Sequence, residues 1–260
     1  MIITSAANEQ IKRVKKLIKS SKERREEGLY VVEGIRMVHE IPSQDVDSIY
    51  VAESAMAKFQ TVLAQFRAVE PIVVKDHVFD SMSDTNTPQG IMALVRMQNY
   101  KLQDVLGEIP FVLIVEHLQD PGNMGTIIRT AEGAGATGVI ISSDSVDIYN
   151  PKVIRSTMGS VFRVPIYVSN DLKKDIDRIR GKDITVYAAH LNGRQFYDND
   201  YTKGSAFLIG NEGNGLSDEI SAKANSLLKI PMMGSVESLN AATSTAVICY
   251  EVLRQRFFSK

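Results

Sequence analysis

The chain has 260 residues, of which 44% are hydrophobic and 23% are charged, a composition typical of globular proteins with one large or two small domains. A single cysteine, Cys249, excludes an internal disulfide and a cysteine-based zinc site, and no apolar run approaches the ~18 residues of a membrane span. The N-terminus is polar and basic rather than signal-like, so we expect a cytoplasmic protein with no membrane partner.

The net charge of −1 conceals a local excess of positive charge. Residues 1–25 hold eight lysines and arginines against two glutamates. Such a cluster is either an electrostatic footprint for nucleic acid or a solvated helix face. The candidates for nucleic-acid contact are Lys12, Arg13, Lys15, Lys16, Arg24 and Arg25, together with Arg36 farther along.

The first hundred residues predict a compact αβ domain. Apolar residues at helical spacing predict an amphipathic helix over residues 8–21. Further helices are expected directly after Gly34 and over residues 54–65 and 76–82, and strands over residues 29–32, 48–52, 71–75 and 90–95. We therefore expect an N-terminal domain over residues 1–100, a polar linker over 101–108 and a second domain over 109–260.

The second domain is predicted to be α/β with a mostly parallel, doubly wound sheet. Apolar strands alternate with helices over most of its length, which is typical of parallel sheets. The expected strands cover residues 111–115, 138–142, 165–168, 184–189, 206–209 and 227–230, and one of the intervening helices covers residues 126–132.

A glycine run at residues 133–138 matches the G-x-G-x-x-G pattern of dinucleotide sites in letters only. It follows a helix and precedes a strand, whereas the dinucleotide fingerprint follows a strand and opens a helix. No acidic residue occurs over 148–170, where the ribose-binding acid should lie. We interpret the glycines as a helix C-cap and a tight turn, which removes the main support for a nicotinamide-dependent oxidoreductase.

A second glycine-rich loop, Gly210 to Gly215, follows the strand at 206–209. It contains Glu212 and no lysine, so it does not match a phosphate-binding loop and suits a ligand that is neutral or cationic at this point. Ser217 is expected to open a short helix beyond this loop, and Ser238 is expected to cap a long C-terminal helix. Ligands of open α/β sheets bind where such strand ends and loops meet.

Three motifs together resemble the SpoU–TrmH branch of the SPOUT RNA methyltransferases. They are NMGTIIRTA from Asn123, IGNEGNGL from Ile209, and IPM from Ile230 with SLNAA from Ser238. The basic N-terminal stretch also resembles the substrate-binding domain of that family. The resemblance implies a C-terminal trefoil knot, S-adenosylmethionine as cofactor, a homodimer formed through the knot domain, and methyl transfer to a ribose 2′-oxygen of RNA.

By the same resemblance, Arg129 is the central catalytic residue, with Asn123, Glu212, Ser238 and Asn240 positioning it, the RNA and the loops. Arginine is a poor base, so a role in fixing the target phosphate and stabilising the developing alkoxide is favoured over proton removal. The implied cofactor contacts are Ala189, His190, Leu191, Gly210, Asn211, Gly213, Ile230, Met232, Ser238 and Leu239. Ala242 stands where the family often has serine, and the four histidines show no metal-ligand spacing, so no metal is expected.

The substrate is expected to be large-subunit rRNA, because a full N-terminal substrate domain resembles the rRNA enzymes more than the tRNA enzymes. A tRNA 2′-O-methyltransferase is the nearest alternative. A non-catalytic RNA-binding or ribosome-assembly factor with the same fold is a further one, although the complete set of motif residues argues against it.

Overall fold

The computed structural model describes residues 2–258 and divides the chain into two compact units. The first comprises Met1–Gln98 and Asp147–Phe162, and the second comprises Asn99–Val146 and Arg163–Lys260. The sequence predicted a change of domain near residue 100. It did not predict that residues 147–162 return to the first unit.

The first unit is built on a five-stranded mixed sheet with the order β1-β4-β3-β5-β2. β5 is antiparallel to both β2 and β3, and the other pairs are parallel. The strands are β1 Ile2–Ile3, β2 Leu29–Glu33, β3 Val46–Ala52, β4 Ile72–Val74 and β5 Ile91–Arg96. The helices are α1 Glu9–Lys19, α2 Ser21–Glu27, α3 Ile35–His39, α4 Gln60–Leu63, α5 Asp76–Met82 and α7 Pro151–Thr157, with 3₁₀ turns η1 Ser43–Asp45, η2 Glu53–Ala55 and η4 Ser160–Phe162.

The expected strands are present as β2 to β5, and the expected helices over 8–21, after Gly34 and over 76–82 are present as α1, α3 and α5. β1, α2 and α7 were not predicted, and the helix over residues 54–65 is wrong. That stretch forms only the η2 turn and the four-residue α4, whose N-cap, Phe59, makes no side-chain cap hydrogen bond. By contrast, Asn8 caps α1 by accepting a hydrogen bond from the Gln10 amide. The apolar spacing of residues 54–65 therefore lacked the start signal that a longer helix needs.

Arg24 binds the start of residues 147–162 within the first unit. It is only 3% exposed, and its Nε and Nη2 donate to Asp147 Oδ2 at 2.9 and 2.6 Å. Its Nη1 donates to the carbonyl oxygen of Leu17 at 2.6 Å, and Tyr149 packs on Tyr30 with ring centroids 4.5 Å apart. A buried guanidinium is held in place only where its donors are satisfied in this way.

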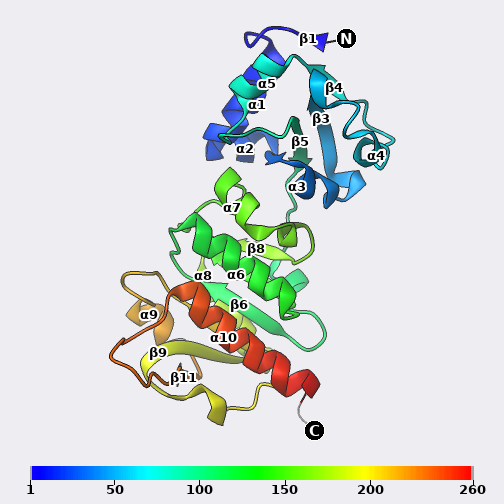
Figure 1. Ribbon diagram of the computed structural model, residues 1–260. Coiled ribbons are helices and arrows are strands. Elements are labelled where there is room, and N and C mark those ends of the chain that lie inside the picture. The colour runs from blue at the N-terminus through cyan, green and yellow to red at the C-terminus, as the bar shows by residue number, and fades with distance from the viewer. Residues whose placement is uncertain (1, 259–260) are drawn as a thin grey trace. The chain divides into compact units, whose positions relative to one another are not determined.

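The second unit contains a six-stranded, entirely parallel sheet with the order β11-β9-β10-β6-β7-β8 (Figure 1). The α/β prediction is thus confirmed. The strands are β6 Phe111–Val115, β7 Gly138–Ser142, β8 Ile166–Ser169, β9 Thr185–Gln195, β10 Ser205–Ile209 and β11 Ser226–Lys229. The helices are α6 Pro121–Gly133, α8 Leu172–Arg180, α9 Asp218–Ser221 and α10 Ala241–Leu253, with 3₁₀ turns η3 Leu102–Val105 and η5 Phe196–Asp198 and a π-helical segment η6 Arg254–Phe258.

Two boundaries in this unit differ from expectation. α6 begins at Pro121 rather than at residue 126, because Asp120 is an N-cap and proline is well suited to the first helical position. β9 continues to Gln195 and contains a register shift opposite Leu227 and Leu228. The glycine run at 133–138 does end α6 and open β7, as predicted, with Gly135 at φ +74°.

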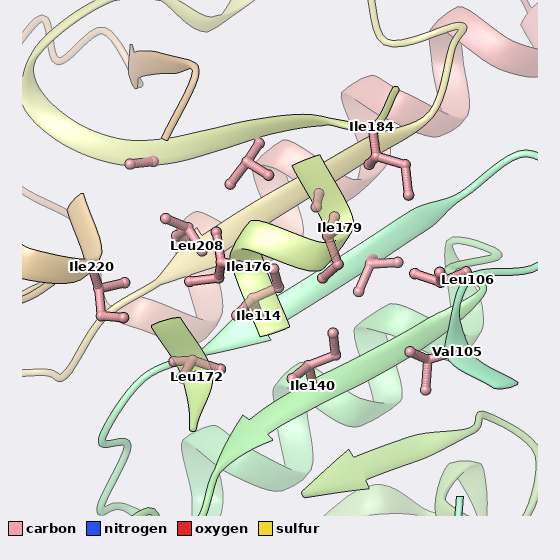
Figure 2. Packing of buried hydrophobic residues seen from close by; sticks show 14 residues of the cluster. Val105, Leu106, Ile114, Ile140, Leu172, Ile176, Ile179, Ile184, Leu208 and Ile220 are labelled. Atoms are coloured by element: carbon pink, nitrogen blue, oxygen red, sulfur yellow. The ribbon is translucent and has the colours of Figure 1, made fainter. Parts of the chain in front are cut away.

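One part of the core of this unit lies between the sheet and α8. Figure 2 shows Leu172, Ile176 and Ile179 of that helix directed toward residues of the central strands such as Ile114 and Leu208. Strands buried on both faces read as continuous apolar runs, which is why they were recognisable in the sequence. α6 and α10 pack side by side (Figure 1).

Candidate active site

Two adjacent strands bring the candidate site together. β6 and β10 pair in parallel, so the connection after β6 and the glycine loop after β10 begin at the same edge of the sheet. The loop is closed on itself, since the amides of Asn211 and Gly215 each donate to the other residue's carbonyl at 2.9 and 3.0 Å. A Cβ at Gly210 would lie 2.2 Å from the carbonyl carbon of Gly215, so this close approach requires glycine.

Asn123 connects three segments that are far apart in the sequence. Its Nδ2 donates to Glu212 Oε1 in the glycine loop at 3.0 Å, and its Oδ1 accepts from Asn240 Nδ2 at 3.0 Å. Asn240 in turn caps α10, because its Oδ1 accepts from the amides of Ala242 and Thr243 at 2.9 and 3.3 Å. Three of the five residues expected to be catalytic thus form one hydrogen-bonded chain.

The position of that cap corrects the prediction for Ser238. The long helix begins at Ala241 and not after Ser238, which is exposed. The asparagine oxygen can accept from two successive amides of the first turn, and a helix N-cap needs such an acceptor.

The Glu212 carboxylate is held in its ionised form. Besides the bond from Asn123, its Oε1 accepts from the amide of Asp120 at 3.2 Å. Partial burial raises the pKa of Glu212, but the hydrogen bonds from Asn123 and from backbone amides outweigh burial and leave the pKa below its ordinary value. The loop therefore presents a negative charge at neutral pH.

Glu116 fixes the far end of the glycine loop and was missed in the sequence. Its carboxylate accepts from the amide of Ser217 at 2.8 Å and from the Ser217 hydroxyl at 2.6 Å. The near end is held as well, since Asn211 Nδ2 donates to the carbonyl of His117 at 2.8 Å. No local signal marks Glu116, because its partner lies 101 residues further along the chain.

Arg129 does not join these contacts. It lies exposed on α6 and makes no hydrogen bond or ion pair within residues 2–258. Its guanidinium is therefore available to a ligand.

The remaining expected cofactor residues lie on β9 and after β11. Ala189, half-buried, and His190, exposed, follow the point where β9 pairs with β10, and Leu191 continues that strand with a side chain outside the described part. Ile230, Met232 and Leu239 are half-buried in the stretch between β11 and α10. Gly213 donates its amide to Asn211 Oδ1 at 2.8 Å.

The basic residues that the sequence predicted to contact RNA divide into three groups. Arg24 is buried and committed to Asp147, so we do not include it among residues that could reach a phosphate. Lys12 and Arg13 form ion pairs with Glu9 and Glu27. The others form no ion pair within residues 2–258 and are at least partly exposed, namely Lys15, Lys16, Arg25 and Arg36.

Comparison with known proteins decides the family. A family model described as "SpoU rRNA Methylase family" matches residues 110–250, and one described as "MRM3-like substrate binding domain" matches residues 8–93. This chain belongs to the SpoU rRNA methylase family. The resemblance noted in the sequence is thereby confirmed.

Individual SpoU relatives are similar over nearly the whole chain. The 23S rRNA (guanosine(2553)-2′-O)-methyltransferase RlmP of Bacillus subtilis is 31% identical over 96% of this chain and 98% of its own length. A 23S rRNA (uridine(2479)-2′-O)-methyltransferase of Streptomyces viridochromogenes is 28% identical over 97% of this chain and 92% of its own. The crystal structure of an AdoMet-bound rRNA methyltransferase from Sinorhizobium meliloti superposes with a TM-score of 0.87 at 29% identity and covers 100% of this chain and 99% of that one.

The charge of the glycine loop fits S-adenosylmethionine. The segment from Ile209 to Ser217 contains no lysine or arginine and carries the ionised Glu212, which suits a sulfonium cation without phosphate. Within residues 2–258 there is no cluster of side chains suited to a metal ion and no helix long and apolar enough to cross a membrane.

Proposed function

We propose that this protein transfers a methyl group from S-adenosylmethionine to a ribose 2′-hydroxyl of 23S rRNA. The observation that carries the proposal is the hydrogen-bonded chain of Asn240, Asn123 and Glu212, which joins the three motif segments at one edge of a parallel sheet. The cofactor supplies an already activated methyl group when bound. The protein's task is then to orient the hydroxyl and to manage charge and proton.

The residues of the site divide these tasks. The segments around Gly210, Ile230 and Leu239 would hold the cofactor largely through backbone groups, with Ala189, His190 and Leu191 forming another wall. Arg129 would bind the target phosphate and stabilise the negative charge that develops on the ribose oxygen, because its guanidinium has no competing partner within residues 2–258. Asn123, Glu212 and Asn240 act as positioning residues.

Large-subunit rRNA is the favoured substrate over tRNA. The chain matches a substrate-binding domain over residues 8–93 and aligns nearly end to end with two relatives named as 23S rRNA 2′-O-methyltransferases. We assign RNA binding to the N-terminal domain, residues 1–100, with Lys15, Lys16, Arg25 and Arg36 as phosphate contacts. Such contacts make the affinity for RNA fall steeply with salt concentration.

The C-terminal trefoil knot, a homodimer and a cytoplasmic location complete the proposal. A dimer formed through the second unit is supported by large apolar side chains exposed on α10 and on the π-helical segment η6 that follows it, namely Tyr250, Phe257 and Phe258, which are 55%, 71% and 73% exposed. Light scattering coupled to size-exclusion chromatography would measure the mass of the assembly directly.

The test compares Arg129→Ala with Arg67→Ala. Arg67 is exposed in the first unit and likewise makes no ion pair or hydrogen bond within residues 2–258, so its replacement removes the same charge elsewhere. Transfer of labelled methyl groups to 23S rRNA should be lost in the first variant and kept in the second, while both still bind S-adenosylmethionine in calorimetry.

Mapping of 2′-O-methyl sites in 23S rRNA with and without the gene would identify the nucleotide. Near-normal turnover of Arg129→Ala would refute the role of Arg129. A wild-type protein that binds the cofactor and RNA without transfer would instead favour the non-catalytic alternative.

A further inference from the structure

The second unit contains a crevice that the proposed reaction does not use. It has a volume of about 590 Å³, which lies in the range of roughly 300–1,000 Å³ typical of small-ligand sites. It is formed by the segment before η3, by β8 and by the C-terminal end of α8. The lining residues that matter for its chemistry are Tyr100, Lys101, Gln103, Tyr167, Arg178 and Lys182.

The charged side chains that line this crevice are all positive. Lys101, Arg178 and Lys182 line it, and no lining residue is acidic. The crevice of about 370 Å³ beside the carboxyl ends of β6, β7 and β8 is the opposite, because it is lined by one lysine and by Glu116, Asp144, Asp171 and Glu219. A polyanion is thus repelled from one crevice and attracted to the other.

Two carboxylates close in sequence to the lining residues are already engaged, whereas Asp183, next to Lys182, is exposed and forms no ion pair within residues 2–258. Asp104 accepts a hydrogen bond from the backbone amide of Lys101 at 2.7 Å, and Asp177 pairs with Lys223. The ammonium groups of Lys101 and Lys182 form no ion pair within residues 2–258. The cations near the end of α8 also complement its dipole, a purely structural role that the experiment below must separate from binding.

A buried carboxylate fixes one wall of the crevice. Asp175 is 3% exposed and accepts from the hydroxyls of Tyr167 and Ser169 at 3.0 and 2.6 Å and from Arg178 Nη1 at 3.0 Å. The Tyr167 ring and the Arg178 guanidinium are therefore held in place before a ligand arrives. A fixed aromatic ring beside fixed and mobile cations is the combination that binds a nucleotide, with the base on the ring and the phosphate on the cations.

We propose that this crevice binds a nucleotide of the substrate RNA, at a position separate from the Asn123–Glu212 site. The inference rests on the proposed function, since it takes RNA to be the substrate. It adds a contact on the second unit itself, with Lys101, Arg178 and Lys182 binding phosphate oxygens and the two tyrosines providing surfaces for a base.

The test uses the full chain and transcribed 23S rRNA as the probe. The variant Lys101→Gln/Lys182→Gln removes the two unpaired cations, and Lys203→Gln/Lys229→Gln is the matched control because both control lysines are exposed on the same unit outside the crevice. RNA affinity is measured over a series of salt concentrations. Each lost contact to single-stranded RNA lowers the slope of log affinity against log salt by about 0.7, so the crevice variant should lose about 1.4 and bind at least tenfold more weakly.

A second variant, Tyr100→Leu, keeps the charge and removes a ring. It should weaken RNA binding about tenfold while leaving the salt slope unchanged, which a loss of helix stability would not do. Calorimetric binding of S-adenosylmethionine and the unfolding temperature should stay at wild-type values in all variants.

The outcomes separate this inference from the proposed function. An unchanged affinity and slope in the crevice variant, or the same loss in the matched control, overturns the crevice as an RNA site even if methyl transfer is intact. If wild-type protein transfers no methyl group to 23S rRNA while the crevice variant still loses RNA affinity selectively, the reaction is refuted and the RNA site stands.

Discussion

The hydrogen bond from Asn123 to Glu212 can be tested by substituting first the donor and then both partners. In the variant Asn123→Asp, a carboxylate replaces the amide that donates to Glu212 Oε1 at 3.0 Å. The bond from Asn240 Nδ2 to position 123 is retained, because an aspartate oxygen also accepts. The substitution thus affects mainly the contact between α6 and the glycine loop.

Two effects of the substitution add up. A hydrogen bond to a charged group contributes about 1.5–3 kcal/mol, and we take the lower value because Glu212 is largely exposed. Two carboxylates at this separation repel each other by about 1.4 kcal/mol at the dielectric constant of water. The sum of about 3 kcal/mol acts against the loop arrangement, so the affinity for S-adenosylmethionine should fall about 100-fold.

A double variant that exchanges the donor and the acceptor of this hydrogen bond is the control for Asn123→Asp. In Asn123→Asp/Glu212→Gln the glutamine amide can donate to the aspartate, so the double variant should bind the cofactor more tightly than Asn123→Asp alone. Calorimetric titration of the wild type, both single variants and the double variant closes the cycle and gives the coupling free energy. The reasoning is refuted if Asn123→Asp binds like the wild type, or if the losses of the two single variants simply add in the double variant.

Three further predictions follow from the same contacts. Glu116→Ala removes both bonds to Ser217 and should weaken cofactor binding about tenfold in calorimetry, whereas the same substitution in a Ser217→Ala background should have a smaller effect. The pKa of Glu212 is lowered from 4.5 in the folded protein, so its stabilising contacts are fully present above pH 4.5 and are lost as pH falls through the lowered value. Cofactor affinity should therefore be flat from pH 8 to 5 and fall below pH 4, and Glu212→Gln should abolish that fall. Arg256→Ala removes donors to four backbone carbonyls and a guanidinium 5.5 Å from the Phe111 ring, so it should cost about 3 kcal/mol and lower the unfolding temperature by about 10 °C in calorimetry, with Arg256→Lys recovering only part.

Much of the fold could be read from local pattern. The strands β6, β7 and β10 are buried and apolar on both faces because helices cover the parallel sheet, and such runs stand out against the polar connections. The motif segments could be recognised equally well in the sequence, because their short polar and glycine-rich stretches follow those strands directly. The hydrogen bonds of Asn123 give a physical reason why the three motif segments lie together in the fold.

The contacts that escaped prediction depend on partners distant in the sequence. Arg24 sits in a basic stretch and was grouped with surface cations, yet Asp147, 123 residues away, draws it into the interior. Glu116 resembles any exposed glutamate until the fold places Ser217 against it. The start of α6, by contrast, could have been found, because Asp120 followed by Pro121 is a cap and first-turn pair.

The candidate site contains side chains of two kinds. Asn123, Glu212 and Asn240 are bound to one another, so they hold the loops in place, and only the charge of Glu212 is left to act on a ligand. Arg129 is exposed and has no partner within residues 2–258, so its binding capacity is intact. Substitutions in the hydrogen-bonded network and substitution of the free Arg129 guanidinium should therefore change different kinetic and binding constants. Substitutions in the network should raise the dissociation constant of S-adenosylmethionine, whereas Arg129→Ala should lower kcat/KM for RNA and leave that constant unchanged. Equal weakening of cofactor binding by Arg129→Ala and Asn123→Asp would show that this division of roles is wrong.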